Sequence, residues 1–206
     1  MISITLIIII VTVAVSLYAS ENEDLKRQLL FNPYSVVHHN KYYKIITHAF
    51  IHADLLHLGI NMYVLHSFGS YLEQLFVRMF GEIGLFYFVI LYFGGISVAT
   101  LPSIWKHKDN PHYNSLGASG AVSAVLFSFI VLNPMAELGL FAIIPLNATL
   151  FGVLYIGYEM YQNKQGRTNI AHDAHLLGAV FGIIFTILLS PTNIINNFIA
   201  EIFGTY

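Results

Sequence analysis

Residues 2–19 read ISITLIIIIVTVAVSLYA, a stretch without a charged side chain. A transmembrane helix needs about 20 predominantly apolar residues, so this stretch is long enough to cross a bilayer. The alternative is a cleaved signal peptide, which usually begins with a basic leader. No Lys or Arg precedes the apolar residues. We therefore expect a retained membrane-spanning helix here.

The composition of the whole chain has the same character. Of 206 residues, 56% are hydrophobic and 10% are charged, whereas soluble domains usually carry about 25% charged residues. So few charges cannot cover a water-facing surface of this size, and lipid is the expected solvent. The net charge of −2 indicates no nucleic-acid partner. The absence of cysteine excludes disulfides and thiolate metal sites.

Polar stretches and prolines divide the chain into a single membrane domain, residues 1–206, with six helices. The polar residues 21–44 predict a long loop at the membrane surface. Pro134 is expected to end a helix and Pro145 to kink the next one, and the tail after the last span suggests a short interfacial helix. The predicted helices cover residues 2–19, 54–77, 83–101, 119–133, 138–158 and 174–189.

Polar residues within the predicted spans point to one site. Such residues usually face the interior of a helix bundle and mark function. His57 and Asn61 lie in the first turns of the second span, Ser119 opens the fourth, and His175 opens the sixth. Because successive spans alternate in direction, these three spans begin on the same side of the membrane. The four residues are therefore expected at one depth, near one leaflet.

The surroundings of Ser119 suit an oxyanion site. Gly117 and Gly120 flank it, and glycine allows a close approach of backbone to substrate. A helix start also offers free N–H groups and the positive end of the helix dipole. His57 and Asn61, four residues apart, share one helical face and can both donate hydrogen bonds.

Small residues predict that the fourth and sixth spans pack closely. Gly178 and Gly182 follow His175 at helical spacing, and Gly117, Ala121 and Ala124 give the fourth span a similar small surface. The His175 ring is therefore expected within reach of the Ser119 hydroxyl, which needs an adjacent base to become a strong nucleophile. Each residue alone fits a structural role equally well; their co-location favours catalysis.

Three stretches together resemble the rhomboid family of intramembrane serine proteases. They are residues 47–62 (THAFIHADLLHLGINM), 117–120 (GASG) and 174–182 (AHLLGAVFG), and residues 69–73 are similar to the end of the family's second helix. The resemblance runs from about Asn32 to Gly182. It implies an all-α membrane fold, a six-transmembrane-helix bundle with a water-filled active-site cavity.

The resemblance also implies roles for individual residues. Ser119 would be the nucleophile and His175 the general base, and His57, Asn61 and the Ser119 backbone N–H would bind the oxyanion. Gly117, Gly120, Gly178 and Gly182 would be the structural glycines of these motifs. The family uses a Ser-His dyad, so no acidic third member is expected and Asp173 is predicted to be a loop or cap residue.

The implied activity is endopeptidase cleavage of single-span membrane proteins within the lipid bilayer, with no cofactor and no metal. The implied location is a multi-pass position in a bacterial-type cell (inner) membrane. By the predicted helices, eight of the nine basic residues fall on the active-site side and only Arg78 opposite. The positive-inside rule points that side to the cytoplasm, whereas the family pattern, which we follow, points it outward.

Two further positions depart from the family. Many relatives carry an aromatic residue four positions after the nucleophile, packed against the catalytic imidazole, where this chain has Ser123. The Trp-Arg pair common in the first loop appears as Tyr43-Lys44, and Tyr still suits the membrane interface. His66 lies mid-span without an assigned role; a neighbour or Glu73 is its expected partner.

Two other classes of function remain open. A metal-dependent membrane hydrolase is suggested by His52, Asp54 and His57, although the five-residue step between the two histidines does not align them on one helical face. A non-catalytic rhomboid-like protein that binds membrane clients would be expected to lack the serine or the histidine, and both are present.

Overall fold

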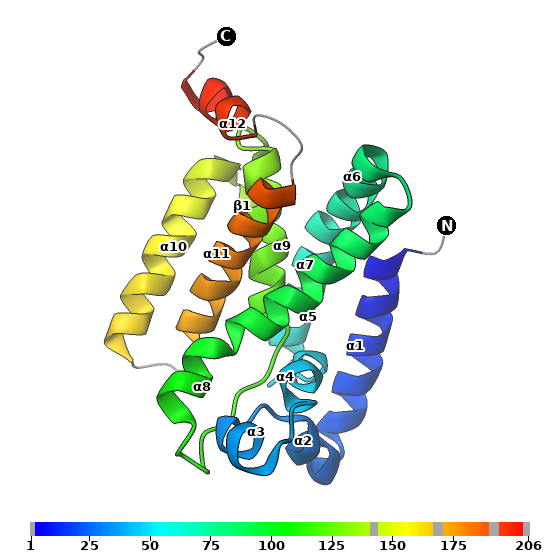
Figure 1. The fold of residues 1–206 in the computed structure, drawn as a ribbon, viewed down its shortest axis with the longest axis vertical. Helices are drawn as coiled ribbons and strands as arrows, with labels where there is room; N and C mark the ends of the chain where they lie inside the picture. Colours follow the sequence, from blue (N-terminus) through cyan, green and yellow to red (C-terminus); the bar gives the residue numbers. More distant parts are fainter. Residues whose placement is uncertain (1–2, 141–143, 167–170, 190–193, 204–206) are drawn as a thin grey trace.

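The computed structural model describes residues 3–140, 144–166, 171–189 and 194–203, and it is mostly helical (Figure 1). The segments at the N-terminal half are α1 (Ile4–Ser20), α2 (Glu23–Leu29), α3 (Pro33–His39), α4 (Lys44–Thr47), the 3₁₀ turn η1 (His48–Phe50), α5 (Leu55–Val64), the π-helical turn η2 (Leu65–Gly69), α6 (Ser70–Phe80), α7 (Ile83–Ala99) and α8 (Leu101–His107). They are followed by α9 (Ser119–Leu132), β1 (Glu137–Leu140), β2 (Ile144–Asn147), α10 (Ala148–Gln165), α11 (His172–Leu189) and α12 (Ile194–Phe203).

The long helices run along the long axis of the molecule in alternating directions (Figure 1). The segments α5, η2 and α6 follow one another without a break and correspond to the predicted helix 54–77. The short helices α2, α3, α4 and α8 gather at one end of the molecule. In the described residues, two helical segments, Ile83–His107 and His172–Leu189, are long and apolar enough to cross a membrane, and Ile4–Ser20 and Ser119–Leu132 are shorter apolar helices.

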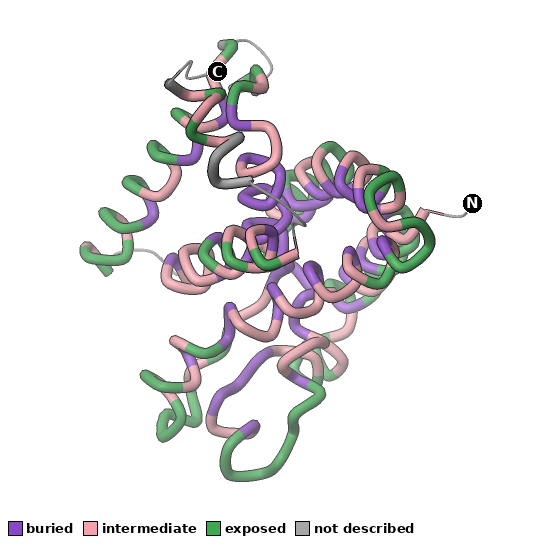
Figure 2. Tube along the Cα trace, turned by 45° about the horizontal axis from the view of Figure 1, so that its top comes forward, coloured by how far each residue is buried: buried purple, intermediate pink, exposed green. Residues whose placement is uncertain are grey.

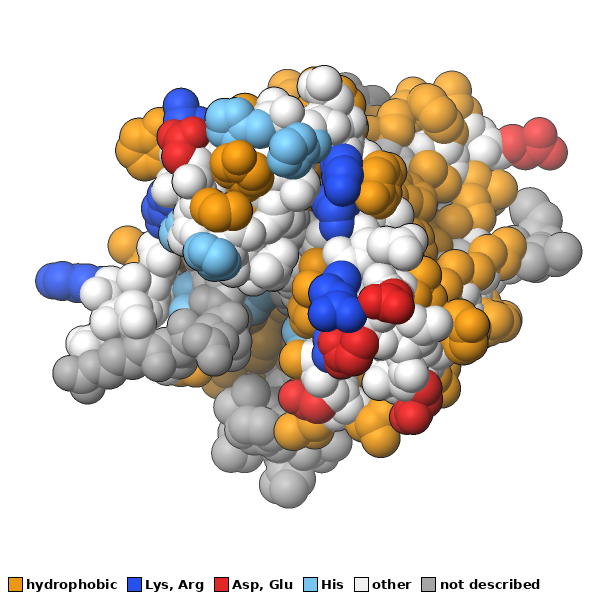
Figure 3. All heavy atoms as spheres, turned by 90° about the horizontal axis from the view of Figure 1, so that it is seen from below, with side chains coloured by type: hydrophobic (Ala, Val, Ile, Leu, Met, Phe, Trp, Pro, Cys, Tyr) orange, Lys and Arg blue, Asp and Glu red, His pale blue; other side chains and the backbone are white. Residues whose placement is uncertain are grey.

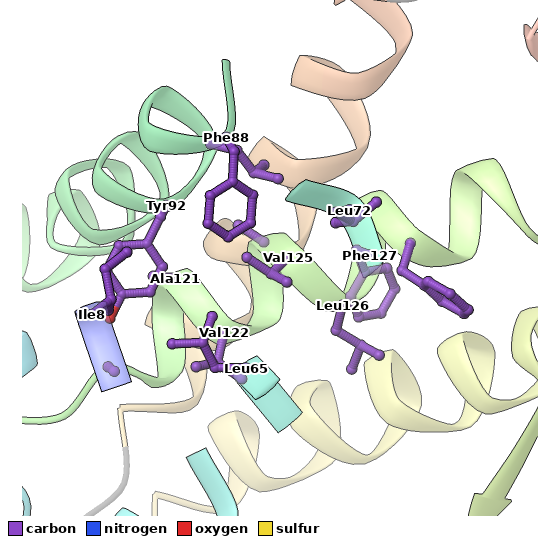
Figure 4. Packing of buried hydrophobic residues seen from close by; sticks show 14 of the residues in the cluster. Ile8, Leu65, Leu72, Phe88, Tyr92, Ala121, Val122, Val125, Leu126 and Phe127 are labelled. Atoms are coloured by element: carbon purple, nitrogen blue, oxygen red, sulfur yellow. The ribbon is translucent and has the colours of Figure 1, made fainter. Parts of the chain in front are cut away.

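Helix α9 forms the centre of the structure. Eleven of its residues are buried, from Gly120 to Ile130, and Figure 2 shows buried positions concentrated along the inner helices. Around Val125, apolar side chains from α7 and the η2–α6 segment complete the core, as Figure 4 shows for Phe88 and Leu72. The central helix thereby fixes where its first residue, Ser119, lies.

Glycines allow α11 to cross α9 at close range. A Cβ added to Gly178 would collide with the carbonyl oxygen of Gly120, and one added to Gly182 would collide with that of Ala124. Further along, the Thr186 hydroxyl donates a hydrogen bond to Ser128 Oγ at 2.6 Å. The close packing predicted from the small residues of these two helices is confirmed.

The predicted helix 138–158 is wrong in its first half. The strands β1 and β2 pair antiparallel there, with Gly139 opposite Pro145. Pro145 lacks the N–H that a helix interior needs, so it lies in a strand and does not kink a helix. Helix α10 begins only after Asn147, whose side chain accepts hydrogen bonds from the next N–H groups. It then continues to Gln165, seven residues beyond the predicted end at Tyr158.

Glu73 connects α6 to the start of α1. Its carboxylate accepts hydrogen bonds from Ser3 Oγ at 2.8 Å, from the N–H groups of Ile4 and Thr5, and from Thr5 Oγ1 at 2.6 Å. A carboxylate suits the positive end of a helix dipole. These partners differ from the expected one, His66, which lies exposed in the π-helical turn.

Candidate active site

Ser119 and His175 meet where α9 and α11 cross. Ser119 is the first residue of α9, and His175 lies in the first turn of α11. The His175 Nε2 atom is 2.6 Å from Ser119 Oγ, a hydrogen-bond distance. Both residues are only partly buried. A hydroxyl and an imidazole are therefore held in direct contact at a position that is not sealed within the core.

Behind His175 lies a carboxylate that the sequence motifs do not indicate. Glu159 Oε1 is 3.1 Å from His175 Nδ1, and its other oxygen, Oε2, is 2.5 Å from His172 Nδ1. Glu159 is buried, with 4% of its surface exposed. The sequence analysis expected no acidic third member, and the structure places a carboxylate in contact with the imidazole. The predicted helix ended at Tyr158, so Glu159 fell one residue outside the predicted spans, whereas α10 extends to Gln165.

Asp173, the acidic residue nearest to His175 in sequence, has a different environment. Its Oδ1 accepts a hydrogen bond from the Ala174 N–H at 2.9 Å, and its Oδ2 lies 2.7 Å from Lys106 Nζ on α8. Asp173 is the second residue of α11, within the helix and not in the loop before it, so the prediction of a loop or cap residue is not confirmed. The ion pair with Lys106 also ties the start of α11 to α8.

Ser123 occupies the position where many relatives carry an aromatic side chain. It is buried one turn after Ser119, and its Oγ lies 2.7 Å from the Tyr155 hydroxyl of α10. The same hydroxyl interacts with the Glu159 carboxylate one turn further along α10. Two polar side chains of α10, Tyr155 and Glu159, therefore continue the hydrogen bonds from Ser123 to the imidazole of His175.

His57 and Gly117 are in contact. Gly117 has φ of 111°, a conformation that glycine adopts without strain, and a Cβ there would lie 2.8 Å from the His57 ring. Asn61 is buried, and its amide donates a hydrogen bond to the His57 carbonyl oxygen at 2.9 Å. The structure thus brings the His57 ring against the backbone two residues before Ser119, with Asn61 one turn further along α5.

The segment between α1 and α5, residues 21–54, is called the first loop below, and it holds this backbone in place. The Gly117 N–H donates to the His48 carbonyl oxygen at 2.9 Å, and the Ala118 N–H donates to His52 Nε2 at 3.4 Å. Burial lowers the pKa of His48 to about 4 and is also the main cause that lowers the pKa of His52 to about 3. Both rings are therefore neutral near pH 7. The hydrogen bond from the Ala118 N–H requires this of His52, because its Nε2 accepts only when it carries no proton.

Asn32 fastens the same loop to the segment that leads to Ser119. Its side-chain oxygen accepts from the Ser35 N–H at 2.7 Å and caps α3. Its amide donates to the carbonyl oxygens of Pro111 and Tyr113 at 3.1 and 2.8 Å. Residues 31 and 115 add an isolated antiparallel bridge. The polar residues 21–44 thus form a folded support for the approach to the site.

Lys44 is buried within this support. Its Nζ donates hydrogen bonds to the carbonyl oxygens of Arg27, Gln28 and Leu30, at 2.9, 2.6 and 2.9 Å, at the end of α2. A cation is favourable at the C-terminal end of a helix dipole. Burial, with a contribution from Lys41, lowers the pKa of Lys44. Tyr43 beside it is half exposed, at 50%, so only the tyrosine of this pair is free to face an interface.

A metal-capable group in the described residues coincides with the candidate active site. It consists of Glu159, His172 and His175, whose potential ligand atoms lie within 4.8 Å of one another. The set suggested by the sequence differs: the His52 and His57 rings make an edge-to-face contact at 5.0 Å, and His52 lies before α5. Zinc prefers three or four such ligands, but hydrogen bonds already join the three groups.

A serine hydroxyl bonded to an imidazole, which is bonded in turn to a carboxylate, is the arrangement found in serine hydrolases. The fold and the site together show a helical protein in which a serine, an imidazole and a carboxylate are joined by hydrogen bonds. The chain belongs to the rhomboid family: the Rhomboid domain matches residues 39–192. It is accordingly a membrane protein.

Similar proteins carry the same family name. RHOMBOID-like protein 12, mitochondrial, from Arabidopsis thaliana is 34% identical over 149 residues, which are 68% of this chain and 44% of that protein. Presenilin-associated rhomboid-like protein A, mitochondrial, from Danio rerio is 30% identical over 68% of this chain and 35% of its own length. Rhomboid protein 1, mitochondrial, from Saccharomyces cerevisiae is 31% identical over 68% and 40%. The chain therefore matches less than half the length of these relatives, and their mitochondrial location does not support the expected bacterial-type membrane.

Proposed function

We propose that this chain is an intramembrane serine endopeptidase that cleaves transmembrane helices of single-span proteins. The observation that carries the proposal is the 2.6 Å contact between Ser119 Oγ and His175 Nε2. A serine hydroxyl becomes a competent nucleophile when a neighbouring base accepts its proton. Membership of the rhomboid family gives the reaction its membrane setting.

The reaction is peptide-bond hydrolysis through an acyl-enzyme. Ser119 Oγ attacks the substrate carbonyl carbon while its proton passes to His175 Nε2. His175 then donates this proton to the leaving amine, and the peptide C–N bond breaks. A water molecule, deprotonated by the same imidazole, releases the acyl group from Ser119. One imidazole thus acts first as base and then as acid.

The developing oxyanion needs hydrogen-bond donors. Helix α9 begins at Ser119 without a side-chain cap in the described part of the chain, and the first N–H groups of a helix have no partner within it. The Ser119 N–H is therefore free to donate. The His57 ring rests against Gly117, and Asn61 follows one turn later on the same face, so both are proposed as further donors.

The proposed membrane arrangement is a multi-pass bundle of six spans: α1, the α5–α6 segment, α7, α9, α10 and α11. Four of these spans, α1, α7, α9 and α11, lie in helical segments that are apolar in composition, which supports the arrangement. The alternating helix directions support it as well (Figure 1). We further propose a water-filled cavity at the end where α2, α3 and α8 lie. Seen from that end, histidine and charged side chains gather over the helix ends, with hydrophobic side chains beside them (Figure 3).

Reaction with a serine-directed fluorophosphonate and cleavage of a model single-span substrate in liposomes test the proposal. Wild type is expected to be labelled and to cleave the substrate. Ser119→Ala should abolish both, and His175→Ala should lose cleavage. Equal labelling of wild type and Ser119→Ala would remove the basis for the assignment.

The same liposome assay separates the alternatives. A protein that only binds membrane clients would retain the substrate without cutting it, in wild type and in Ser119→Ala alike. A metal-dependent hydrolase would lose activity with a chelator and regain it with zinc, and it would tolerate Ser119→Ala. A serine mechanism predicts that chelator has no effect.

A further inference from the structure

Glu159 is placed so that each of its carboxylate oxygens meets one imidazole of α11. Oε1 lies 3.1 Å from His175 Nδ1, and Oε2 lies 2.5 Å from His172 Nδ1. An ionised carboxylate only accepts hydrogen bonds, so each Nδ1 must carry the donated proton. In neutral His175 the other nitrogen, Nε2, is then an acceptor, and it is this nitrogen that faces the Ser119 hydroxyl.

The contacts of Glu159 join three helices. Ser119 and Ser123 lie one turn apart on α9; the first bonds to His175 of α11, and the second bonds to Tyr155 of α10. Tyr155 and Glu159 lie one turn apart on α10 and interact with each other. The contacts therefore run from α9 through α10 and α11 and back to α9. Both side chains of the carboxylate–imidazole pair are poorly exposed, at 5% for Glu159 and 14% for His175.

We propose that Glu159 is a positioning residue for the proposed hydrolysis: it fixes the tautomer and orientation of His175 and stabilises the imidazolium that forms when Ser119 attacks. This inference rests on the proposed function. During acylation the Ser119 proton moves to His175 Nε2 as the Oγ–carbon bond forms, and it leaves with the amine. The carboxylate gains no proton and retains both hydrogen bonds throughout. The His172 ring supports it from the opposite oxygen.

A purely structural role would need no negative charge opposite the imidazole. Glu159 lies on the far side of His175 from Ser119, as the acidic member of a catalytic triad does. A buried carboxylate without donors is strongly unfavourable, and here the two imidazoles and the Tyr155 hydroxyl supply them.

The pH dependence of the reaction distinguishes these roles. His175 is surrounded by groups from four other helices. The Ser119 hydroxyl comes from α9, and the ionisable groups are Glu159 and Tyr155 on α10, His57 on α5, His172 on its own helix, and the Asp173–Lys106 pair between α11 and α8. Glu159 contributes a negative charge in direct contact with the ring. Removing it takes away the negative charge opposite the imidazolium that forms when Ser119 attacks.

The test uses the full-length Glu159→Gln variant in liposomes, with fluorophosphonate labelling rates and substrate cleavage measured from pH 5 to 9. We expect kcat to fall by roughly 10- to 100-fold, less than the about 10²–10⁴-fold that a general acid–base group itself contributes, because Glu159 acts only through His175. KM should change little. The acidic limb of the rate profile should move to lower pH. Glutamine offers one acceptor and one donor group, so it cannot accept from both imidazoles.

Glu73→Gln is the matched control, because it also neutralises a buried carboxylate but at the start of α1. It is expected to lower the melting temperature and leave the position of the acidic limb unchanged. If Glu159→Gln does not fold, Glu159→Asp decides: it keeps the charge but is too short to reach both rings, so kcat should fall while the limb stays in place.

The outcomes separate the two proposals. A wild type that neither cleaves nor labels would defeat the proposed function itself. An active wild type with folded Glu159→Gln of unchanged kcat and unchanged pH profile would overturn only the role of Glu159. If only Glu159→Asp folds, wild-type kcat in that variant would overturn the role as well.

Discussion

Polar side chains that are buried in the first loop have defined partners, although the loop is polar in composition. Lys44 donates to three carbonyl oxygens at the end of α2. His48 donates from Nδ1 to the Lys44 carbonyl oxygen at 3.0 Å and packs against Phe31, with ring centroids 5.2 Å apart. These contacts place the His48 carbonyl oxygen where Gly117 needs an acceptor. Single loop residues thereby act on the geometry around Ser119.

The low pKa of His48 predicts how stability depends on pH. Its folded pKa of about 4 lies below the ordinary histidine value of 6.5, so between these values the unfolded chain binds a proton that the folded chain does not. Stability is therefore complete above pH 6.5 and falls as the pH drops toward 4, by up to about 3 kcal/mol from this residue. Melting temperatures in detergent at pH 7.5 and 5.0 measure the effect. His48→Gln should narrow the difference between the two pH values; an undiminished difference would contradict the assignment.

Asn61 predicts a graded effect on catalysis. If it is one of several oxyanion donors, Asn61→Ala slows cleavage by about 10²–10³ without abolishing it. KM should change little, because the donor acts mainly in the transition state. Steady-state cleavage in liposomes measures this, and Ser119→Ala defines the background. A loss as complete as that of Ser119→Ala would assign Asn61 a different role.

At the scale of elements, two features decide the site: the α9–α11 crossing and the start of α10. The crossing needs glycine, because Gly178 and Gly182 face backbone carbonyls of α9. The hairpin before α10 shifts that helix along the chain, so that Tyr155 and Glu159 lie beside α9 and α11. Element boundaries and packing distances therefore determine which side chains meet.

Gly178→Ala tests the crossing. The added methyl collides with Gly120, and we expect a loss of about 1–3 kcal/mol from overpacking, together with lower activity, since His175 lies one turn away. Gly157→Ala is the matched control on α10, because nothing lies within 4 Å of its added Cβ. That change should leave activity intact and stabilise by about 0.5–1 kcal/mol. Melting curves and cleavage rates check both; equal behaviour of the two variants would argue against the close crossing.

At the scale of the whole molecule, charge is distributed unevenly between its ends. The basic residues of α2, the first loop, α8 and the end of α10 lie at the end where α9 and α11 begin (Figures 1 and 3). Arg78 lies in the last turn of α6, a helix that ends at the other end of the molecule (Figure 1). Arg167, one of the eight predicted for the active-site side, lies outside the described residues. The positive-inside rule and the family pattern give opposite orientations for this end.

The absence of cysteine from the sequence makes the topology directly measurable. Single cysteines at Asp24, Asp109 and Lys164 should react with a membrane-impermeant maleimide from one side of the membrane. Single cysteines at Glu82 and Met135 should react only from the other side, because the helices alternate in direction. In intact cells, the side that reacts also gives the orientation. Labelling of all five from the same side would contradict the six-span arrangement.

The sequence alone predicted a membrane protein, most helix positions and the candidate residues Ser119 and His175. Apolar spans can be read locally along the chain, and their number gives the direction of each helix. The sequence could not give the contacts of Glu159 or Lys44. Their partners come from segments distant in sequence, and the β1–β2 pairing, which shifts α10, depends on contacts that periodicity does not record. Burial then changes the chemistry: a carboxylate beside two imidazoles, out of water, acts differently from one in a polar loop. Only the tertiary structure decided that.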